Sequence, residues 1–186
     1  SRINSVHAVT DAVHRAGVKP FMLVQASAVG FYGSRGQEVL DEESSAGSGF
    51  LSDVCRLWEG EALTLLNRGI DVAFIRTGVV LSGEGGFLAR LLPLFRAGLG
   101  GYPALSPLWI PWIHIADEIG AIMYILDRRY TGPFNLAAPG IVTITRCGGN
   151  HRPTVHHPTT VRADHQRRRN RGRAHPAANA TFSRAW

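Results

Sequence analysis

Residues 21–36 read FMLVQASAVGFYGSRG, where a run of apolar side chains gives way to small residues and glycines. A short apolar run bounded by turn residues is typical of a strand that is buried on both faces, as in a parallel sheet. We therefore expect a buried strand over 21–27 and a glycine-rich turn over 28–36.

The flanking sequence alternates between helical and strand patterns. Apolar residues at helical spacing predict helices over 3–16, 50–66, 87–101 and 116–127. Compact apolar runs predict further strands over 71–81, 109–115 and 132–138. Helices that alternate with buried strands indicate an α/β fold with a parallel sheet.

In such folds, ligands bind at the carboxyl ends of the strands. Two segments direct attention to these positions, Ala26–Ala28 at the end of the first strand and Arg76–Val79 in the second, together with the loops that follow them. Arg76 is suited to ligand contact because an unpaired buried arginine is costly, although an ion pair with Glu59 or Asp117 is an equally good interpretation.

Four motifs follow one another along residues 24–139, namely VQASAVGFYG, RTGVVLSGEGG, WIPWIHIADEIGAIMYIL and GPFNLAAP. Their order and spacing resemble the extended short-chain dehydrogenase/reductase superfamily, and more narrowly its NAD(P)-dependent epimerase-family branch with an additional C-terminal domain. The resemblance covers residues 1–143. It implies part of a Rossmann-like parallel sheet with flanking helices, together with part of a small substrate domain.

The resemblance implies NADP or NAD as the cofactor. The candidate cofactor-binding residues are those at the strand ends, Ala26, Ser27, Arg76, Thr77, Gly78 and Val79. The family's glycine-rich nucleotide fingerprint, which brings backbone amides to the pyrophosphate, has no counterpart in this sequence. By the resemblance, residue 1 falls in a crossover helix of the Rossmann domain. We therefore expect a fragment that binds the cofactor very weakly or not at all.

The superfamily uses a catalytic tyrosine with a lysine four residues later, whose charge lowers the pKa of the phenol. Aligned on Glu59, these positions hold Leu51 and Cys55, which supply neither a phenol nor a fixed positive charge. The segment FLSDVCRLWE nevertheless resembles the branch's own version of this helix. The only lysine in the sequence is Lys19.

The superfamily also uses a serine or threonine hydroxyl. Counting from the strand end places this hydroxyl at Ser27, whereas counting back from Tyr32 without a gap places it at Ala28. Ser27 and Tyr32 are the candidate catalytic residues. The structural alternatives are a Ser27 that only ends a buried strand and a Tyr32 that packs its ring.

The segment WIPWIHI over 109–115 contains the candidate substrate contacts, His114 and Trp109. The apolar neighbours of His114 favour a different role, in which it orients the start of the following helix. Trp109 either lines the substrate cleft or closes the core. Asp117 fits the first turn of that helix, where the helix dipole favours an acid.

Charge is concentrated at one end of the chain. The 186 residues carry a formal charge of +6, but residues 146–186 contain nine arginines and one aspartate, a net +8, which leaves −2 for residues 1–145. The tail has no leucine or isoleucine, so it cannot bury enough apolar surface to offset its ordering entropy. We expect residues 1–145 to form the C-terminal part of an epimerase-like domain and residues 146–186 to be a basic, disordered tail.

The abrupt change of composition near Thr145 suggests that the tail is a frameshift product rather than a nucleic-acid arm. Its histidines match no standard zinc-ligand spacing, so we expect no metal site. No apolar run in the sequence reaches membrane-spanning length. We expect a cytoplasmic protein with a small-molecule substrate and with no membrane or specific nucleic-acid partner, and leave the oligomeric state open.

The leading hypothesis is an NAD(P)-dependent epimerase or oxidoreductase-like protein that acts on a small carbonyl or nucleotide-sugar-like substrate, here incomplete. The first alternative is a cofactor-binding pseudoenzyme, used as a sensor or scaffold, because the Tyr–Lys pair is missing. The second is a basic nucleic-acid-binding protein, which only the tail supports.

The arginine run DHQRRRNRGR over 164–173 should attract any polyanion, and its binding to DNA should not depend on the base sequence. Its affinity for duplex DNA should fall by about 0.9 log unit per log unit of salt for each phosphate neutralised. Fluorescence anisotropy should show that deletion of residues 146–186 abolishes DNA binding, while circular dichroism of the remaining chain stays unchanged. A preference above about 1,000-fold for one duplex over random sequence would contradict this.

Overall fold

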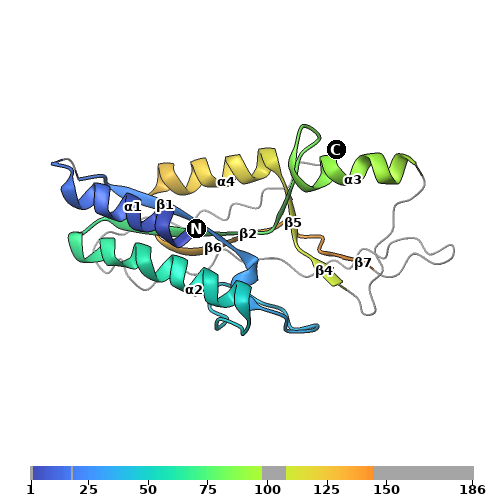
Figure 1. Ribbon diagram of the computed structural model, residues 1–186, viewed down its shortest axis with the longest axis horizontal. Helices are drawn as coiled ribbons and strands as arrows, with labels where there is room; N and C mark the ends of the chain where they lie inside the picture. The colour runs from blue at the N-terminus through green and yellow to red at the C-terminus, as the bar shows by residue number, and fades with distance from the viewer. Residues whose placement is uncertain (1, 18, 98–107, 145–186) are drawn as a thin grey trace.

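The computed structural model describes residues 2–17, 19–97 and 108–144 (Figure 1). The expected disordered tail lies outside these residues. The main sheet is parallel and has the strand order β1–β2–β6, with β1 over Met22–Ala28, β2 over Asp71–Thr77 and β6 over Gly132–Leu136. The α/β class with a parallel sheet is confirmed.

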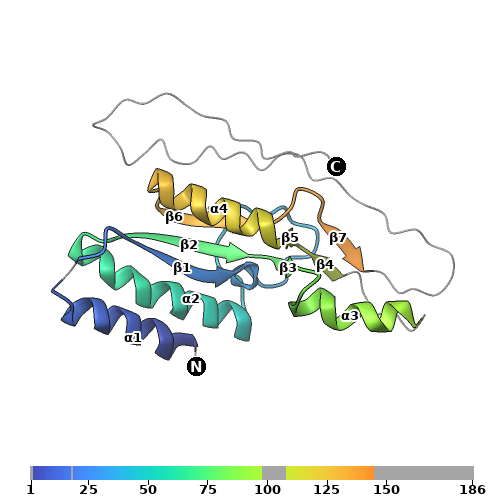
Figure 2. The same ribbon diagram turned by 90° about the horizontal axis from the view of Figure 1, so that it is seen from above.

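Helices cover both faces of this sheet. Helices α1 (Arg2–Arg15) and α2 (Phe50–Leu63) lie on one face, and α4 (Ile115–Arg128) lies on the other (Figure 2). Alternate residues of a strand point to opposite faces. Val72 and Phe74 of β2 therefore join the cluster under α1 and α2, whereas Ala73 and Ile75 join the cluster under α4.

Shorter elements extend beyond the carboxyl ends of the main strands (Figure 1). A parallel pair joins β3 (Val79–Leu81) to β5 (Trp112–His114), and an antiparallel pair joins β4 (Leu108–Ile110) to β7 (Val142–Ile144). Helix α3 spans Gly86–Arg96, and 3₁₀ turns span Val29–Tyr32 (η1) and Thr64–Arg68 (η2).

The structure corrects the bounds of four expected elements. The expected strand over 71–81 is split at Gly78, and the expected segment over 109–115 is split at Pro111. The expected helix over 87–101 ends at Arg96, and its last residues fall outside the described part of the chain. The helix expected to reach residue 66 gives way to η2 after Leu63.

Gly78 is the point where the chain leaves one sheet for another. Its amide donates to the carbonyl of Leu136 at 3.0 Å, and the next amide, of Val79, donates to the carbonyl of Pro111 at 2.7 Å. A Cβ at Gly78 would lie 2.7 Å from the Pro111 oxygen, so no side chain fits while these backbones remain in place. The close approach explains why one apolar run becomes two strands.

We expect Gly78→Ala to destabilise the fold by about 1–3 kcal/mol, because the added methyl group overpacks a site enclosed by backbone. Gly60→Ala on α2 is the matched control, since no atom of the described part of the chain lies within 4 Å of its added Cβ. That control should stabilise the protein by about 0.5–1 kcal/mol. Urea unfolding of both variants measures the difference, and equal midpoints would show that Gly78 is not constrained.

Candidate functional site

A row of polar residues crosses the main sheet near its carboxyl end. Ser27 of β1 is paired in register with Arg76 of β2, and Arg76 with Asn135 of β6. Ser27 and Arg76 lie on the same face as Val72 and Phe74, beneath α2. Ser27 and Arg76 are thus brought together at the strand ends, where the sequence placed candidate site residues.

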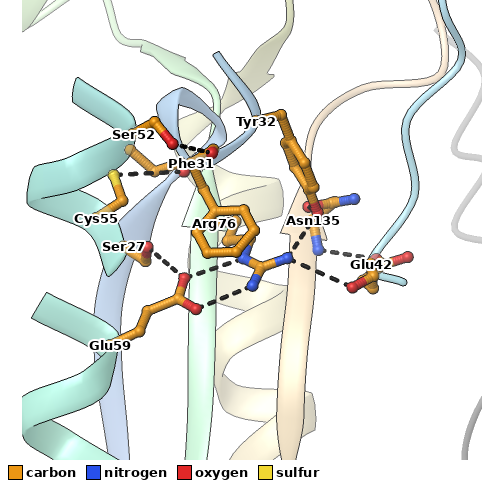
Figure 3. A network of polar contacts seen from close by, with 10 residues as sticks. Ser27, Phe31, Tyr32, Glu42, Ser52, Cys55, Glu59, Arg76 and Asn135 are labelled. Carbon is orange, nitrogen blue, oxygen red and sulfur yellow. Dashed lines mark hydrogen bonds and ion pairs between the residues drawn. The ribbon is translucent and has the colours of Figure 1, made fainter. Parts of the chain in front are cut away.

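Glu59 of α2 binds both Ser27 and Arg76 of this row (Figure 3). Its Oε1 accepts from Arg76 Nε and its Oε2 from Arg76 Nη2, both at 2.9 Å, and Ser27 Oγ donates to Oε1 at 2.7 Å. The relative exposures of Arg76, Glu59 and Ser27 are only 5%, 7% and 5%. The ion pair with Glu59, one of the two partners considered for Arg76, is therefore present, bidentate and buried.

Tyr32 closes the network on the other side of Arg76. Its hydroxyl donates to Asn135 Oδ1 at 2.7 Å and accepts from Arg76 Nη1 at 2.9 Å. Burial raises the pKa of the Tyr32 phenol above its usual value, and the hydrogen bond from Arg76 only partly opposes this shift. The phenol is accordingly protonated at neutral pH and acts as a hydrogen-bond donor. The guanidinium carbon of Arg76 also lies 3.5 Å from the ring centroid of Phe31.

The loop over 33–49, called the strap below, lies against the ends of β2 and β6. Glu42 Oε1 accepts from the backbone amide of Asn135 at 2.9 Å, and the Glu42 carbonyl accepts from Arg76 Nη1 at 3.4 Å. The strap returns to α2 at Gly47, where an added Cβ would lie 2.0 Å from the carbonyl oxygen of Tyr32. Ser52 Oγ lies 2.9 Å from the Gly47 carbonyl.

The first turns of α2 run alongside the chain that follows β1. Cys55 Sγ lies 3.9 Å from the Ala28 carbonyl, and a Cβ built at Gly30 would lie 3.5 Å from that of Leu51. Leu51 and Cys55 are the residues that align with the superfamily's tyrosine and lysine when the alignment is fixed at Glu59. Leu51 is exposed and Cys55 is buried. Of the two positions considered for the superfamily's hydroxyl, Ser27 donates its hydroxyl to Glu59, and Ala28 carries no hydroxyl.

The opposite face of the sheet holds a buried carboxyl group that the sequence did not single out. Thr77 Oγ1 donates to Glu118 Oε1 at 2.7 Å, while the buried Oε2 has no hydrogen-bond partner among the residues that the structure describes. Burial raises the pKa of Glu118 above its usual value, and the hydrogen bond from Thr77 works against this shift. Glu118 and Asp117 both lie in the first turn of α4, as expected for Asp117.

The two candidate substrate contacts lie on other elements. His114 is the N-cap of α4, and its Nδ1 accepts from the amide of Ala116 at 3.2 Å, which is the helix-orienting role considered for it. Trp109 is an exposed residue of β4. Neither belongs to the row of Ser27, Arg76 and Asn135.

Three residues of the site escaped sequence reasoning, namely Asn135, Glu42 and Glu118. Asn135 carried a usable signal, because it is the one polar residue in the apolar run GPFNLAA and stands near a strand end. Glu42 sits in an acidic loop where several carboxylates looked equivalent. In the ranges that the structure describes, no group of three or more potential metal ligands is found, and no helix is long and apolar enough to cross a membrane.

The buried carboxyl group of Glu118 should make folding stability depend on pH. Its folded pKa is raised, so its contribution is fully present below the unfolded pKa and is lost as pH rises through the folded pKa. Glu118→Gln should therefore be more stable than the wild type at pH 8, by about 1 kcal/mol, with the advantage fading toward pH 4. Asp117→Asn is the control and should give no such gain. Urea midpoints across pH measure both, and a Glu118→Gln gain independent of pH would contradict the assignment.

Comparison with known proteins places this geometry in a family. No protein-family model matches the chain. An epimerase family protein of Mycobacterium leprae is 40% identical over 144 residues, which cover 77% of this chain and 46% of the relative. The chain thus spans about half the length of the curated relatives it matches.

Two solved structures are similar in both sequence and fold. A nucleoside-diphosphate sugar epimerase from Corynebacterium glutamicum has a TM-score of 0.67 and 41% identity, covering 77% of this chain and 31% of that one. The human epimerase family protein SDR39U1 (isoform 2), solved with NADPH, has a TM-score of 0.65 and 30% identity, covering 75% and 48%. With its Rossmann-like sheet and these relatives, the chain belongs to the epimerase family of the extended short-chain dehydrogenase/reductase superfamily.

Proposed function

We propose that this chain forms the nicotinamide- and substrate-facing part of an NAD(P)-dependent epimerase or oxidoreductase that acts on a small carbonyl or nucleotide-sugar-like substrate. The observation that carries the proposal is that accessible residues and a buried polar network lie together at the carboxyl ends of the strands. A rim of small, accessible residues lies at the carboxyl ends of β1 and β2, next to the buried network around Arg76.

The rim residues are partly or fully exposed, in contrast to Ser27, Tyr32 and Arg76; they are Ala26, Ala28, Thr77, Gly78 and Val79. Small side chains allow a flat ligand to approach the backbone closely, and the carboxyl ends of parallel strands are where α/β folds bind ligands. The described rim therefore fits a nicotinamide ring. When bound, the cofactor supplies hydride transfer, and the protein supplies binding and orientation.

The buried network has a supporting role in this proposal. Ser27 donates to Glu59 and Tyr32 to Asn135, so both hydroxyls already have acceptors. They remain the candidate proton donors to a substrate carbonyl. For either to act, its present hydrogen bond must be exchanged for one to the substrate, and for Tyr32 this requires access past the strap.

The relatives support the cofactor and the substrate class. The human protein was solved with NADPH, and the Corynebacterium protein is described as a nucleoside-diphosphate sugar epimerase. Because the chain spans about half of such relatives, the cofactor's pyrophosphate contacts are expected from sequence that these 186 residues lack.

A cofactor-binding pseudoenzyme is the second candidate, and a specific observation favours it. Leu51 and Cys55 align with the superfamily's tyrosine and lysine. The exposed Leu51 beside Gly30 has no acidic or basic group that could replace the tyrosine. Such a protein would bind NADPH at the rim without turning over a substrate.

We expect the 186-residue chain to bind NADPH with a dissociation constant weaker than about 1 mM, the affinity of a site worth only about 4 kcal/mol. A fusion that places, before Ser1, the segment preceding the matched region of the Mycobacterium leprae relative should bind at micromolar concentration. In this fusion, Ala28→Leu should weaken binding about tenfold by filling the rim, whereas Gly60→Ala should not. Isothermal titration calorimetry measures the NADPH affinity of the unfused chain, the fusion and the two fusion variants.

Micromolar binding by the unfused chain, or an unaffected Ala28→Leu fusion, would count against the proposed site. Turnover assays of the fusion with nucleotide sugars and small carbonyls then separate the two candidates. Oxidation of NADPH in their presence supports the enzyme, and tight binding without turnover supports the pseudoenzyme.

A further inference from the structure

The rim at the carboxyl ends of β1 and β2 contains a single polar side chain. Its residues are Ala26, Ala28, Thr77, Gly78 and Val79, and only Thr77 has a side chain that forms hydrogen bonds. Thr77 is half-buried, and it is paired in register with Ala28 across the two strands. A hydrogen bond from a rim side chain to a ligand must therefore come from Thr77.

The Thr77 side chain points toward α4, away from the network around Arg76. Alternate residues of a strand face opposite sides of the sheet. Ala73 and Ile75 of β2 belong to the cluster under α4, and Thr77 continues this period. Its hydroxyl lies 2.7 Å from Oε1 of Glu118, in the first turn of α4. The hydroxyl thus connects the rim with a buried carboxyl group.

The surroundings of Glu118 favour the neutral form of this carboxyl group. Its relative exposure is 7%, and Oε2 has no hydrogen-bond partner in the described part of the chain. Ionisation would leave a charged oxygen buried without a partner, which costs far more than a neutral one. A neutral carboxyl group has one O–H group that donates. When this O–H group is on Oε1, the contact with Thr77 Oγ1 is kept with Glu118 as the donor.

Other ionisable groups lie at the edges of the surface that α4 covers. In the described chain, the residues of β1, β2 and β6 that face α4 are ionisable only at Asp71, and Tyr130 lies just before β6, so both are at the opposite, amino ends of the strands. The short strands β3 and β5 contribute only His114. His114 and Asp117 are exposed at the start of α4. Burial is accordingly the main cause that raises the pKa of Glu118.

Reduction of a carbonyl group requires a proton donor as well as a hydride. When the carbonyl carbon accepts a hydride, the oxygen gains negative charge and must be protonated. The hydroxyls of Ser27 and Tyr32 would first have to leave Glu59 and Asn135. The Thr77 hydroxyl needs no such exchange, because a hydroxyl that accepts from a neutral carboxyl group can donate its own proton elsewhere.

We propose that Thr77 is the catalytic residue that protonates the substrate oxygen, and that Glu118 is a positioning residue that holds the next proton behind it. This inference rests on the proposed function. In reduction, the carbonyl carbon accepts the hydride from NADPH, which is oxidised to NADP, and the electron pair of the C=O π bond moves to the oxygen. The oxygen takes the proton of Thr77 Oγ1, and Thr77 takes the proton of Glu118 Oε1. The resulting carboxylate is protonated again from solvent, and oxidation of an alcohol reverses each step.

The 186-residue chain, labelled with ¹³C-glutamate, tests the proton on Glu118 without any ligand. The carboxyl resonance that Glu118→Gln removes should titrate above the usual pKa of glutamate. Thr77→Val should raise this pKa further, because the hydrogen bond from Thr77 works against the shift. Thr77→Ser keeps the hydroxyl and should titrate nearly as the wild type does. A Glu118 carboxyl group that titrates at or below the usual pKa, or that Thr77→Val does not affect, would overturn the inference.

The fusion described above tests the reaction with two probes, diacetyl as a small carbonyl compound and UDP-4-keto-6-deoxyglucose as a nucleotide-sugar ketone. The kcat for NADPH oxidation should fall as pH rises through the pKa of Glu118, because only the protonated carboxyl group supplies a proton. Thr77→Val should lower kcat by about 100-fold with little change of KM, as expected for loss of a positioned proton donor. Thr77→Ser should recover most of this loss.

Two neighbouring acids in the first turn of α4 provide the matched comparison. Glu118→Gln keeps the size of the side chain and a hydrogen bond to Thr77, but it has no proton to transfer. Its kcat should fall by about tenfold and lose the dependence on pH. Asp117→Asn should keep both the rate and its pH dependence. Because Glu118→Gln is expected to be the more stable protein at pH 8, unfolding would not explain its lower rate.

The outcomes separate this inference from the proposed function. Turnover that survives in Thr77→Val, or a pH profile that Glu118→Gln leaves unchanged, would overturn the inference while the proposed enzyme stands. A wild-type fusion that binds NADPH but reduces neither ketone would overturn the inference and support the pseudoenzyme. A fusion that fails to bind NADPH would overturn both proposals.

Discussion

The site depends on the need to compensate one buried positive charge. The Arg76 guanidinium is almost fully buried at the end of β2, and a buried charge without partners costs several kcal/mol. Its acceptors come from separate parts of the chain, with Glu59 on α2, Tyr32 at the end of η1 and the Glu42 carbonyl on the strap. Each of these segments must stay in place for Arg76 to remain satisfied. A single charge thus ties a helix, a turn and a loop to the carboxyl end of the sheet.

In this arrangement, the residues that hold the site together differ from the residues that a ligand would touch. The charged and hydroxyl groups that sequence reasoning favoured as ligand contacts are mostly satisfied by one another, whereas the accessible positions are small residues such as Ala26, Ala28 and Gly78. Catalytic sites are often built this way, with a rigid buried layer that fixes the geometry of a surface that the ligand touches. The same logic applies on the other face, where Thr77 stands at the rim and holds the buried Glu118.

Sequence patterns located most of the elements but not their contacts. The strand over 21–27 and the helices over 3–16 and 116–127 were predicted closely, because apolar periodicity reports which face is buried. The split at Gly78 was missed because a change of strand partner leaves an apolar run uninterrupted. Arg76 was identified, yet its partner was left open between Glu59 and Asp117, since pairing across 17 residues depends on how α2 docks. Asn135 and Glu42 meet only through tertiary structure, and their 93-residue separation leaves no local signal.

Ala26 joins the accessible rim to the buried interior of β1. Its side chain is exposed at the rim, while its backbone carbonyl accepts from the side chain of the buried Gln25. In α/β folds, ligands bind in the crevice outside the carboxyl ends of the strands. In the proposed function, the rim forms the nicotinamide-facing part of such a crevice, and the pyrophosphate contacts are expected elsewhere. Weak cofactor binding by the 186-residue chain would then follow even though the network around Arg76 is fully formed.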